Sequence, residues 1–75
     1  MIYAIEKRKI SGYGTVETIY EIVSYEGIYD NGIPYQCKKL AEFKTKEKAE
    51  KSMRKRNCEF AYERTKGQFI YLKVV

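Results

Sequence analysis

The chain has 75 residues, which is enough for one domain with one small hydrophobic core. Its hydrophobic fraction of 44% is too high for a disordered chain, and its 33% of charged residues must lie mostly on the surface. No apolar run approaches the length of a membrane span, and the first residues lack the basic start and long apolar stretch of a signal peptide. We therefore expect a single domain over residues 1–75 that is soluble, cytoplasmic and without a membrane partner.

Several kinds of catalytic and metal chemistry lack their usual residues. The sequence contains no histidine, the commonest general base and a frequent metal ligand. Cys37 and Cys58 are too far apart for a zinc motif, and we expect two reduced, partly buried thiols. The segment Gly12-Tyr13-Gly14 lacks the third glycine and the following helix of a nucleotide-binding loop. With no close carboxylate pair in an apolar setting either, we expect no enzyme, no metal site and no cofactor.

Residues 1–10 and 15–25 predict two strands joined by a turn. The turn, residues 11–14, contains two glycines, which supply the positive φ that other residues resist. The second strand is rich in β-branched and aromatic residues. Its apolar side chains lie on both faces: Val16, Tyr20 and Ile22 on one, and Ile19, Val23 and Tyr25 on the other. This pattern favours a central strand or an oligomer contact.

A second hairpin is predicted in the middle of the chain. Asn31-Gly32 is the preferred centre of a type I′ turn. The turn should join a strand ending near Tyr29 to one beginning near Ile33. Residues 35–43 then alternate between polar and apolar side chains, which predicts one continuous strand there.

The next segment has the features of a single helix. Thr45 is a suitable N-cap, and residues 46–57 contain good helix formers with no glycine or proline. The apolar stripe is thin and consists of Ala49 and Met53. A helix with so narrow an apolar face must lie on a sheet.

The end of the chain predicts two further strands. Residues 58–65 could extend the helix, but we prefer a short strand with Phe60 and Tyr62 on one face. A turn at Lys66-Gly67 leads into an apolar last strand, residues 68–75, which must be buried in the sheet or against a partner. The expected fold is α+β, in the order β-β-β-α-β-β. It is an antiparallel sheet of four to five strands with one helix packed on it.

The positive charge is concentrated in one segment. The net charge is +5, and residues 44–56 hold seven basic and two acidic residues. The remaining positions hold eight of each and cancel. Helical geometry places Lys48, Lys51 and Lys55 together on the face opposite the apolar stripe. This arrangement is typical of a solvated surface helix, which we slightly favour, and it also suits a ridge that binds nucleic acid or an acidic protein.

Tyrosine is unusually frequent. The chain has eight tyrosines and three phenylalanines, more aromatic residues than one small core needs. Tyrosine offers a large contact area with few rotors to immobilise, so binding surfaces favour it. The candidates for exposed contacts, in or near loops, are Tyr13, Tyr25, Tyr29 and Tyr35. The competing interpretation is that they are ordinary strand-forming aromatics.

The whole chain resembles, in general style, the small accessory proteins that bacteriophages and other mobile elements encode. The resemblance rests on its brevity, its Lys/Glu/Tyr/Ile-rich composition, a strand beginning at Met1 and the strand–Thr–helix passage FKTKEKA at residues 43–49. It implies a protein that acts in the host cytoplasm and inhibits host defence. Such proteins often occupy a host protein or sequester a nucleotide signal.

We therefore expect a non-enzymatic binding protein that blocks or sequesters a partner, either a host protein or a nucleotide-like ligand. Because small domains often gain burial by pairing, we expect a homo-oligomer. The alternative is a nucleic-acid-binding protein that uses the basic helix of residues 44–56. We expect function to depend more on the loop-proximal tyrosines than on the helix lysines, because exposed lysines are flexible and strongly hydrated.

Overall fold

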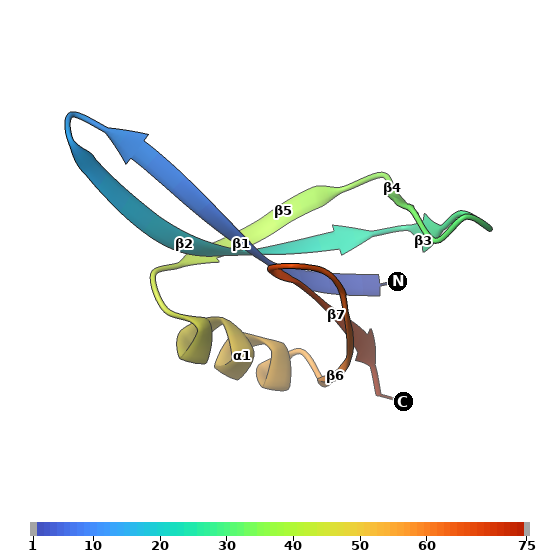
Figure 1. Ribbon diagram of the computed structural model, residues 1–75. Helices are drawn as coiled ribbons and strands as arrows, with labels where there is room; N and C mark the ends of the chain where they lie inside the picture. The colour runs from blue at the N-terminus through green and yellow to red at the C-terminus, as the bar shows by residue number, and fades with distance from the viewer. Residues whose placement is uncertain (1, 75) are drawn as a thin grey trace.

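Five antiparallel strands form one sheet, and a single helix packs against one of its faces (Figure 1). The computed structural model describes residues 2–74. Across the sheet the strand order is β5 (Lys38–Phe43), β2 (Thr15–Tyr25), β1 (Ile2–Gly12), β7 (Gln68–Lys73) and β6 (Cys58–Thr65). The helix is α1 (Lys46–Lys55), and two short strands, β3 (Gly27–Ile28) and β4 (Pro34–Tyr35), form a separate ribbon. The predicted α+β class and the single helix on an antiparallel sheet are confirmed.

Strand β1 is the central strand of the sheet, and its second half, after Glu6, projects beyond the other strands. It pairs with β2 along its whole length but with β7 only from Ile2 to Glu6. Since β5 joins β2 only from Tyr20 onward, residues 7–19 form a free two-stranded arm, seen at the upper left of Figure 1. The two turn residues with positive φ at its tip are Tyr13 and Gly14, whereas the sequence predicted Gly12 and Gly14.

The main hydrophobic core lies between the sheet and α1. Ile5 of β1, Ile22 of β2 and Met53 of α1 are fully buried, and Ala49 is buried beside them. Strand side chains alternate between the two faces, so each strand contributes every second residue to this core. The predicted thin apolar stripe of the helix is confirmed. The predicted central position of residues 15–25 is also confirmed, since β2 lies between β5 and β1.

The ends of α1 are set by local chemistry. The Thr45 hydroxyl accepts a hydrogen bond from the Lys48 backbone N–H at 3.3 Å, which confirms the predicted N-cap. The helix ends at Lys55, two residues earlier than predicted. Asn57 follows with a φ of 57°, a left-handed conformation that asparagine tolerates and that turns the chain into β6.

The middle hairpin exists, but two of its predicted details are wrong. Tyr29 and Ile33 close a three-residue loop, and within it only Gly32 has positive φ. This matches a type I turn with a glycine bulge rather than a type I′ turn, which needs two positive φ values. The predicted strand over residues 35–43 is broken, because Gln36 has a φ of 57° and separates β4 from β5.

Residues 58–65 form the edge strand β6, as preferred over a longer helix. Phe60 and Tyr62 do not share a face, however. Phe60 lies opposite Tyr71 and Tyr62 lies opposite Ile70, so the register shifts by one residue between them. Such a bulge reverses the alternation of the strand.

The last strand is only partly buried. β7 lies inside the sheet between β1 and β6, as the apolar ending predicts. Yet Leu72 and Val74 are 47% and 45% exposed, and Val75 lies outside the described residues. Within residues 2–74, no helix is long and apolar enough to cross a membrane.

We predict that Met53→Ala lowers the free energy of unfolding by about 2–5 kcal/mol, because it opens a cavity under a helix held by few apolar residues. Val16→Ala is the control, since Val16 is 69% exposed on the arm and its change should stay within about 0.5 kcal/mol. Urea unfolding followed by circular dichroism measures both. Equal losses for the two variants would contradict the described packing of α1.

Candidate binding site on the helix-free face of the sheet

The sheet face that α1 leaves uncovered carries a row of carboxylates. Gln68 lies opposite Glu6, Glu6 lies opposite Glu21, and Glu21 lies opposite Glu42. The row thus crosses β7, β1, β2 and β5 and places three carboxylates side by side. Like charges directly opposite each other destabilise a sheet, so this register requires neighbouring donors and cations.

Glu6 is held by neutral donors. Its Oε2 accepts hydrogen bonds from the Tyr25 hydroxyl and from Nε2 of Gln68. Gln68 Nε2 also donates to the Tyr25 hydroxyl at 3.0 Å, and its Oε1 accepts from Nε of Arg64 at 2.6 Å. Burial of the Tyr25 phenol and its hydrogen bond to Glu6 raise the pKa of Tyr25 above its usual value. The buried groups of this network therefore have partners and fixed orientations.

Glu21 is held by two cations. Arg8 donates to its Oε1 at 3.1 Å, and Nζ of Lys39 lies 3.3 Å from its Oε2. Lys39 also bridges to Glu42 at 2.7 Å. Burial alone would raise the pKa of the Glu21 carboxyl, but the hydrogen bonds from Arg8 and Lys39 outweigh it, so the pKa lies below its usual value.

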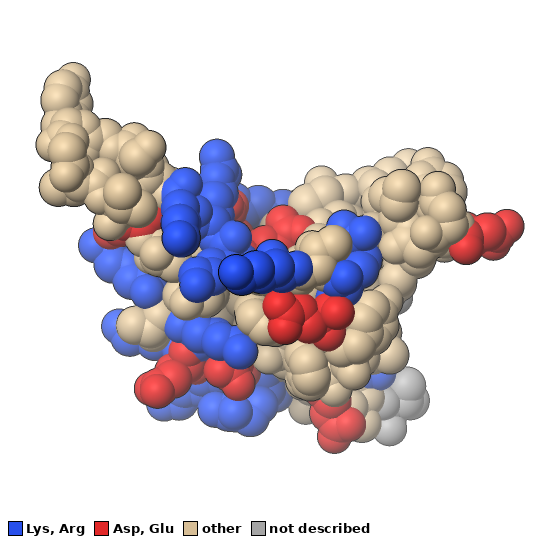
Figure 2. Space-filling view, in the orientation of Figure 1, with Lys and Arg blue, Asp and Glu red and all other residues tan. Residues whose placement is uncertain are grey.

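An open hollow of about 450 Å³ lies over this network, and we call it the saddle. Four cations and two carboxylates of this face line it: Arg8, Lys39, Arg64 and Lys66, with Glu6 and Glu21. Lys7 also borders it, but its register in β1 places its side chain on the α1 face with Ile5. The excess is two positive charges, or one when Glu42 beside Lys39 is counted. Figure 2 shows Lys and Arg side chains gathered between the arm and the β3–β4 hairpin. Among residues 2–74, Arg64 and Lys66 have no carboxylate within ion-pair distance, in contrast to Arg8 and Lys39.

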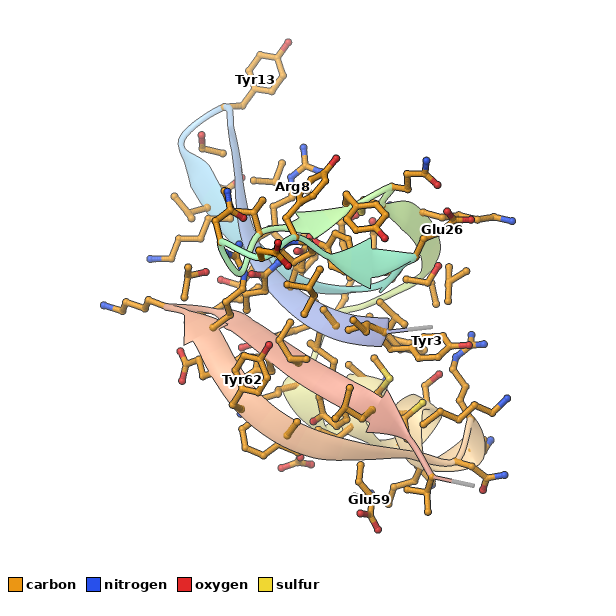
Figure 3. All side chains as sticks on the ribbon, turned by 90° about the vertical axis from the view of Figure 1, so that its right-hand side faces the viewer. Tyr3, Arg8, Tyr13, Glu26, Glu59 and Tyr62 are labelled. Carbon is orange, nitrogen blue, oxygen red and sulfur yellow. The ribbon has the colours of Figure 1, made fainter. Side chains whose placement is uncertain are left out.

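An apolar row lies beside the carboxylate row. Tyr62 of β6 lies opposite Ile70, Ile70 opposite Ala4, and Ala4 opposite Val23. The last three are buried, whereas Tyr62 is 43% exposed. Figure 3 shows Tyr62 on the side of β6 and β7 that faces away from α1. The helix-free face therefore presents one exposed aromatic ring next to a basic hollow.

The structure places the four predicted tyrosines in different settings. Tyr13 is fully exposed at the tip of the arm (Figure 3), and Tyr29 is 57% exposed on the β3–β4 hairpin. Tyr35 is half-buried: its ring lies 4.5 Å from that of Tyr29 and covers Gly27, where a side chain would collide with it. The expectation that Tyr25 is exposed is wrong, because β2 continues through Tyr25 and its ring is buried. Figure 1 shows the arm and the hairpin at opposite ends of the molecule.

The predicted lysines of the helix lie together. Lys48, Lys51 and Lys55 are exposed and, with Phe43 and Ser52, line a shallow hollow of about 220 Å³. This surface is not isolated from the saddle. Lys7 lines the saddle and also a hollow beside the helix start that includes Lys44 and Lys46. In Figure 2, basic side chains run from the saddle down to the helix.

The site residues that the sequence did not predict are those of the saddle, together with Tyr62. Their signal in the sequence is faint, because Glu21 shares its strand face with the apolar Ile19 and Val23 and the basic residues lie among acidic ones. Within residues 2–74, no group of three His, Cys, Asp or Glu side chains is placed to hold a metal ion. Cys37 is exposed and Cys58 is buried, and neither forms a disulfide.

The fold and the site together define an α+β protein with a basic hollow on one sheet face. No protein-family model, no curated protein and no solved structure matches the chain. The resemblance to accessory proteins of bacteriophages therefore stays a prediction, and the site must be interpreted from its own chemistry.

We predict that Glu21 makes the protein sensitive to acid. Because its folded-state pKa is lowered, it stabilises the fold above its unfolded-state pKa of about 4.3, and this stability is lost as the pH falls below that value. Glu21→Gln should flatten the decline of the unfolding free energy in this range, measured by urea unfolding at a series of pH values. Glu59→Gln, at an exposed carboxylate with no ion pair among residues 2–74, should leave the decline unchanged. The same slope in wild type and Glu21→Gln would contradict the pairing of Glu21 with Arg8 and Lys39.

Proposed function

We propose that the protein is a non-enzymatic binding protein that blocks or sequesters an anionic partner held in the saddle. One observation carries this proposal: the saddle has more cations than its own carboxylates need. Arg8 and Lys39 are engaged by Glu21, whereas Arg64 and Lys66 have no carboxylate partner among residues 2–74. Clustered positive charge raises the local concentration of anions and speeds their association.

Two projecting elements on either side of the saddle support the same function. The arm presents Tyr13 and the β3–β4 hairpin presents Tyr29, both exposed. Exposed aromatic rings on projecting hairpins are well suited to contact a partner that enters between them. A host protein with an acidic surface meets this description, whereas a nucleotide signal would occupy the saddle alone. A homo-oligomer and a cytoplasmic location are further predictions of the same proposal.

A second candidate function, nucleic-acid binding, is favoured by one specific observation. Lys7 connects the saddle to the helix start, so the basic surface is longer than the ridge of residues 44–56 alone. A polyanion that follows both regions would contact more phosphates, and each contact adds affinity and salt dependence.

We predict that Arg64→Glu with Lys66→Glu weakens the binding of anions roughly tenfold or more, because it reverses the charge of the two unengaged cations. Lys51→Glu with Lys55→Glu is the matched control, since it changes the net charge equally on the helix. The probes are a fluorescein-labelled polyglutamate peptide and a labelled 12-nucleotide single strand, measured by fluorescence anisotropy at low salt. Circular dichroism checks that each variant is folded.

The outcomes separate the two candidate functions. A larger loss for the saddle pair than for the helix pair supports the saddle as the binding site. A larger loss of oligonucleotide affinity in the helix pair would show instead that the basic helix is the binding site. Wild-type protein that binds neither probe would contradict an anionic partner altogether.

A further inference from the structure

The apolar row and the saddle adjoin, and together they fit one kind of ligand. We propose that the saddle binds a nucleotide, with the base stacked on Tyr62 and the phosphates bound by Arg64 and Lys66. This inference rests on the proposed function, since it names the anionic ligand that the saddle holds. It adds a residue, Tyr62, that neither the charge pattern nor the loop tyrosines indicate.

Tyr62 has the setting of a stacking platform. It is 43% exposed, and in the apolar row it stands beside Ile70, which is fully buried. Leu72, two residues along β7 on the same face, is 47% exposed and widens the apolar area. A base stacks on an aromatic ring through its π-face, and every base has one, so such a platform accepts any nucleotide.

The spacing between the two halves of the site suits a nucleotide. Tyr62 and Arg64 are two residues apart on β6, roughly 7 Å at the usual rise of a strand. This is comparable to the separation of base and 5′-phosphate in a mononucleotide. The register of β6 shifts between Glu63 and Thr65, which identifies Arg64 as the bulge residue. Its hydrogen bond to Gln68 shows that its side chain extends over the helix-free face.

Arg64 is held in place and still has donors to offer. Its Nε donates to Oε1 of Gln68 at 2.6 Å, and the Gln68 amide is itself fixed by Glu6 and Tyr25. The two terminal nitrogens make no hydrogen bond to residues 2–74 and form the planar fork that phosphate prefers. A side chain fixed in this way loses little freedom on binding. Lys66, two residues on, supplies a second cation.

A nucleotide accounts for both the exposed ring of Tyr62 and the cations of the saddle better than an acidic peptide does. Carboxylates would use the cations but have no flat surface for Tyr62. The saddle, at about 450 Å³, also lies within the usual range of small-ligand sites. Of the two carboxylates beneath it, Glu21 is neutralised by Arg8 and Lys39, whereas Glu6 keeps its charge and is hydrogen-bonded by Tyr25 and Gln68. Glu21 therefore opposes a phosphate less than a free carboxylate would.

Titration calorimetry with two probes, ADP and inorganic pyrophosphate, tests the proposal, because both offer a diphosphate and only ADP offers a base. Wild-type protein should bind ADP about tenfold more tightly than pyrophosphate. Tyr62→Ala should abolish this difference and leave pyrophosphate binding unchanged, whereas Tyr62→Phe should keep it. Lys66→Gln should weaken both ligands several-fold, and its matched control Lys55→Gln should weaken neither.

Two results would overturn the proposal. The first is that wild-type protein binds ADP no more tightly than pyrophosphate. The second is that Tyr62→Ala lowers the affinity for both ligands equally. In either case, pyrophosphate binding that depends on Lys66 would still support an anionic partner. If neither pyrophosphate nor polyglutamate binds wild-type protein, the proposed function itself fails. A cyclic dinucleotide or a 12-nucleotide single strand that binds more tightly than ADP, with the same dependence on Tyr62, supports the proposal and identifies the source of the nucleotide.

Discussion

The register of β1 between β2 and β7 is the constraint on which the rest of the structure depends. Ile5 must point toward α1 to complete the core, and this directs Ala4 and Glu6 to the opposite face. A slip of one residue would exchange the two sets and bury Glu6 under the helix. Because neighbouring strands are paired in register, fixing β1 also fixes Glu21 and Glu42 in line with Glu6.

The distribution of positive charge on the helix-free face follows from this carboxylate row. Some of the cations are needed by the fold itself, since Arg8 and Lys39 neutralise Glu21 and Lys39 also pairs with Glu42. Arg64 has a different role, because it bonds a neutral amide and keeps its charge available. A count of charges cannot make this distinction, but the hydrogen-bond partners can. The proposed site therefore rests on the unengaged cations rather than on the total charge.

The sequence predicted the elements that depend on local pattern. Alternation predicted the strands, the Thr45 hydroxyl predicted the helix start, and Met53 predicted the buried helix face. The predictions failed where one residue changes the backbone, as at Gln36, which breaks a strand, and at residue 61, whose bulge turns Tyr62 to the other face. The residue types at these two positions give no warning of a break, because glutamine and alanine are both common within regular strands and helices.

The saddle could not be predicted for a different reason. Its cations come from residues 8, 39 and 64–66, which are separated in sequence and lie among acidic residues. Outside residues 44–56 the charges cancel by count, so the sequence pointed to the helix. Only the strand order β5-β2-β1-β7-β6 brings the three segments together.

The central claim is that the helix-free face, and not the helix, is the binding surface. An NMR titration of the 15N-labelled protein with tripolyphosphate tests this most directly, because it reports every backbone amide of a chain this small. We predict that the largest chemical-shift changes occur in residues 64–68 and at the Arg64 side chain, with small changes in α1. The largest changes in residues 48–55, with residues 64–68 unaffected, would contradict the claim.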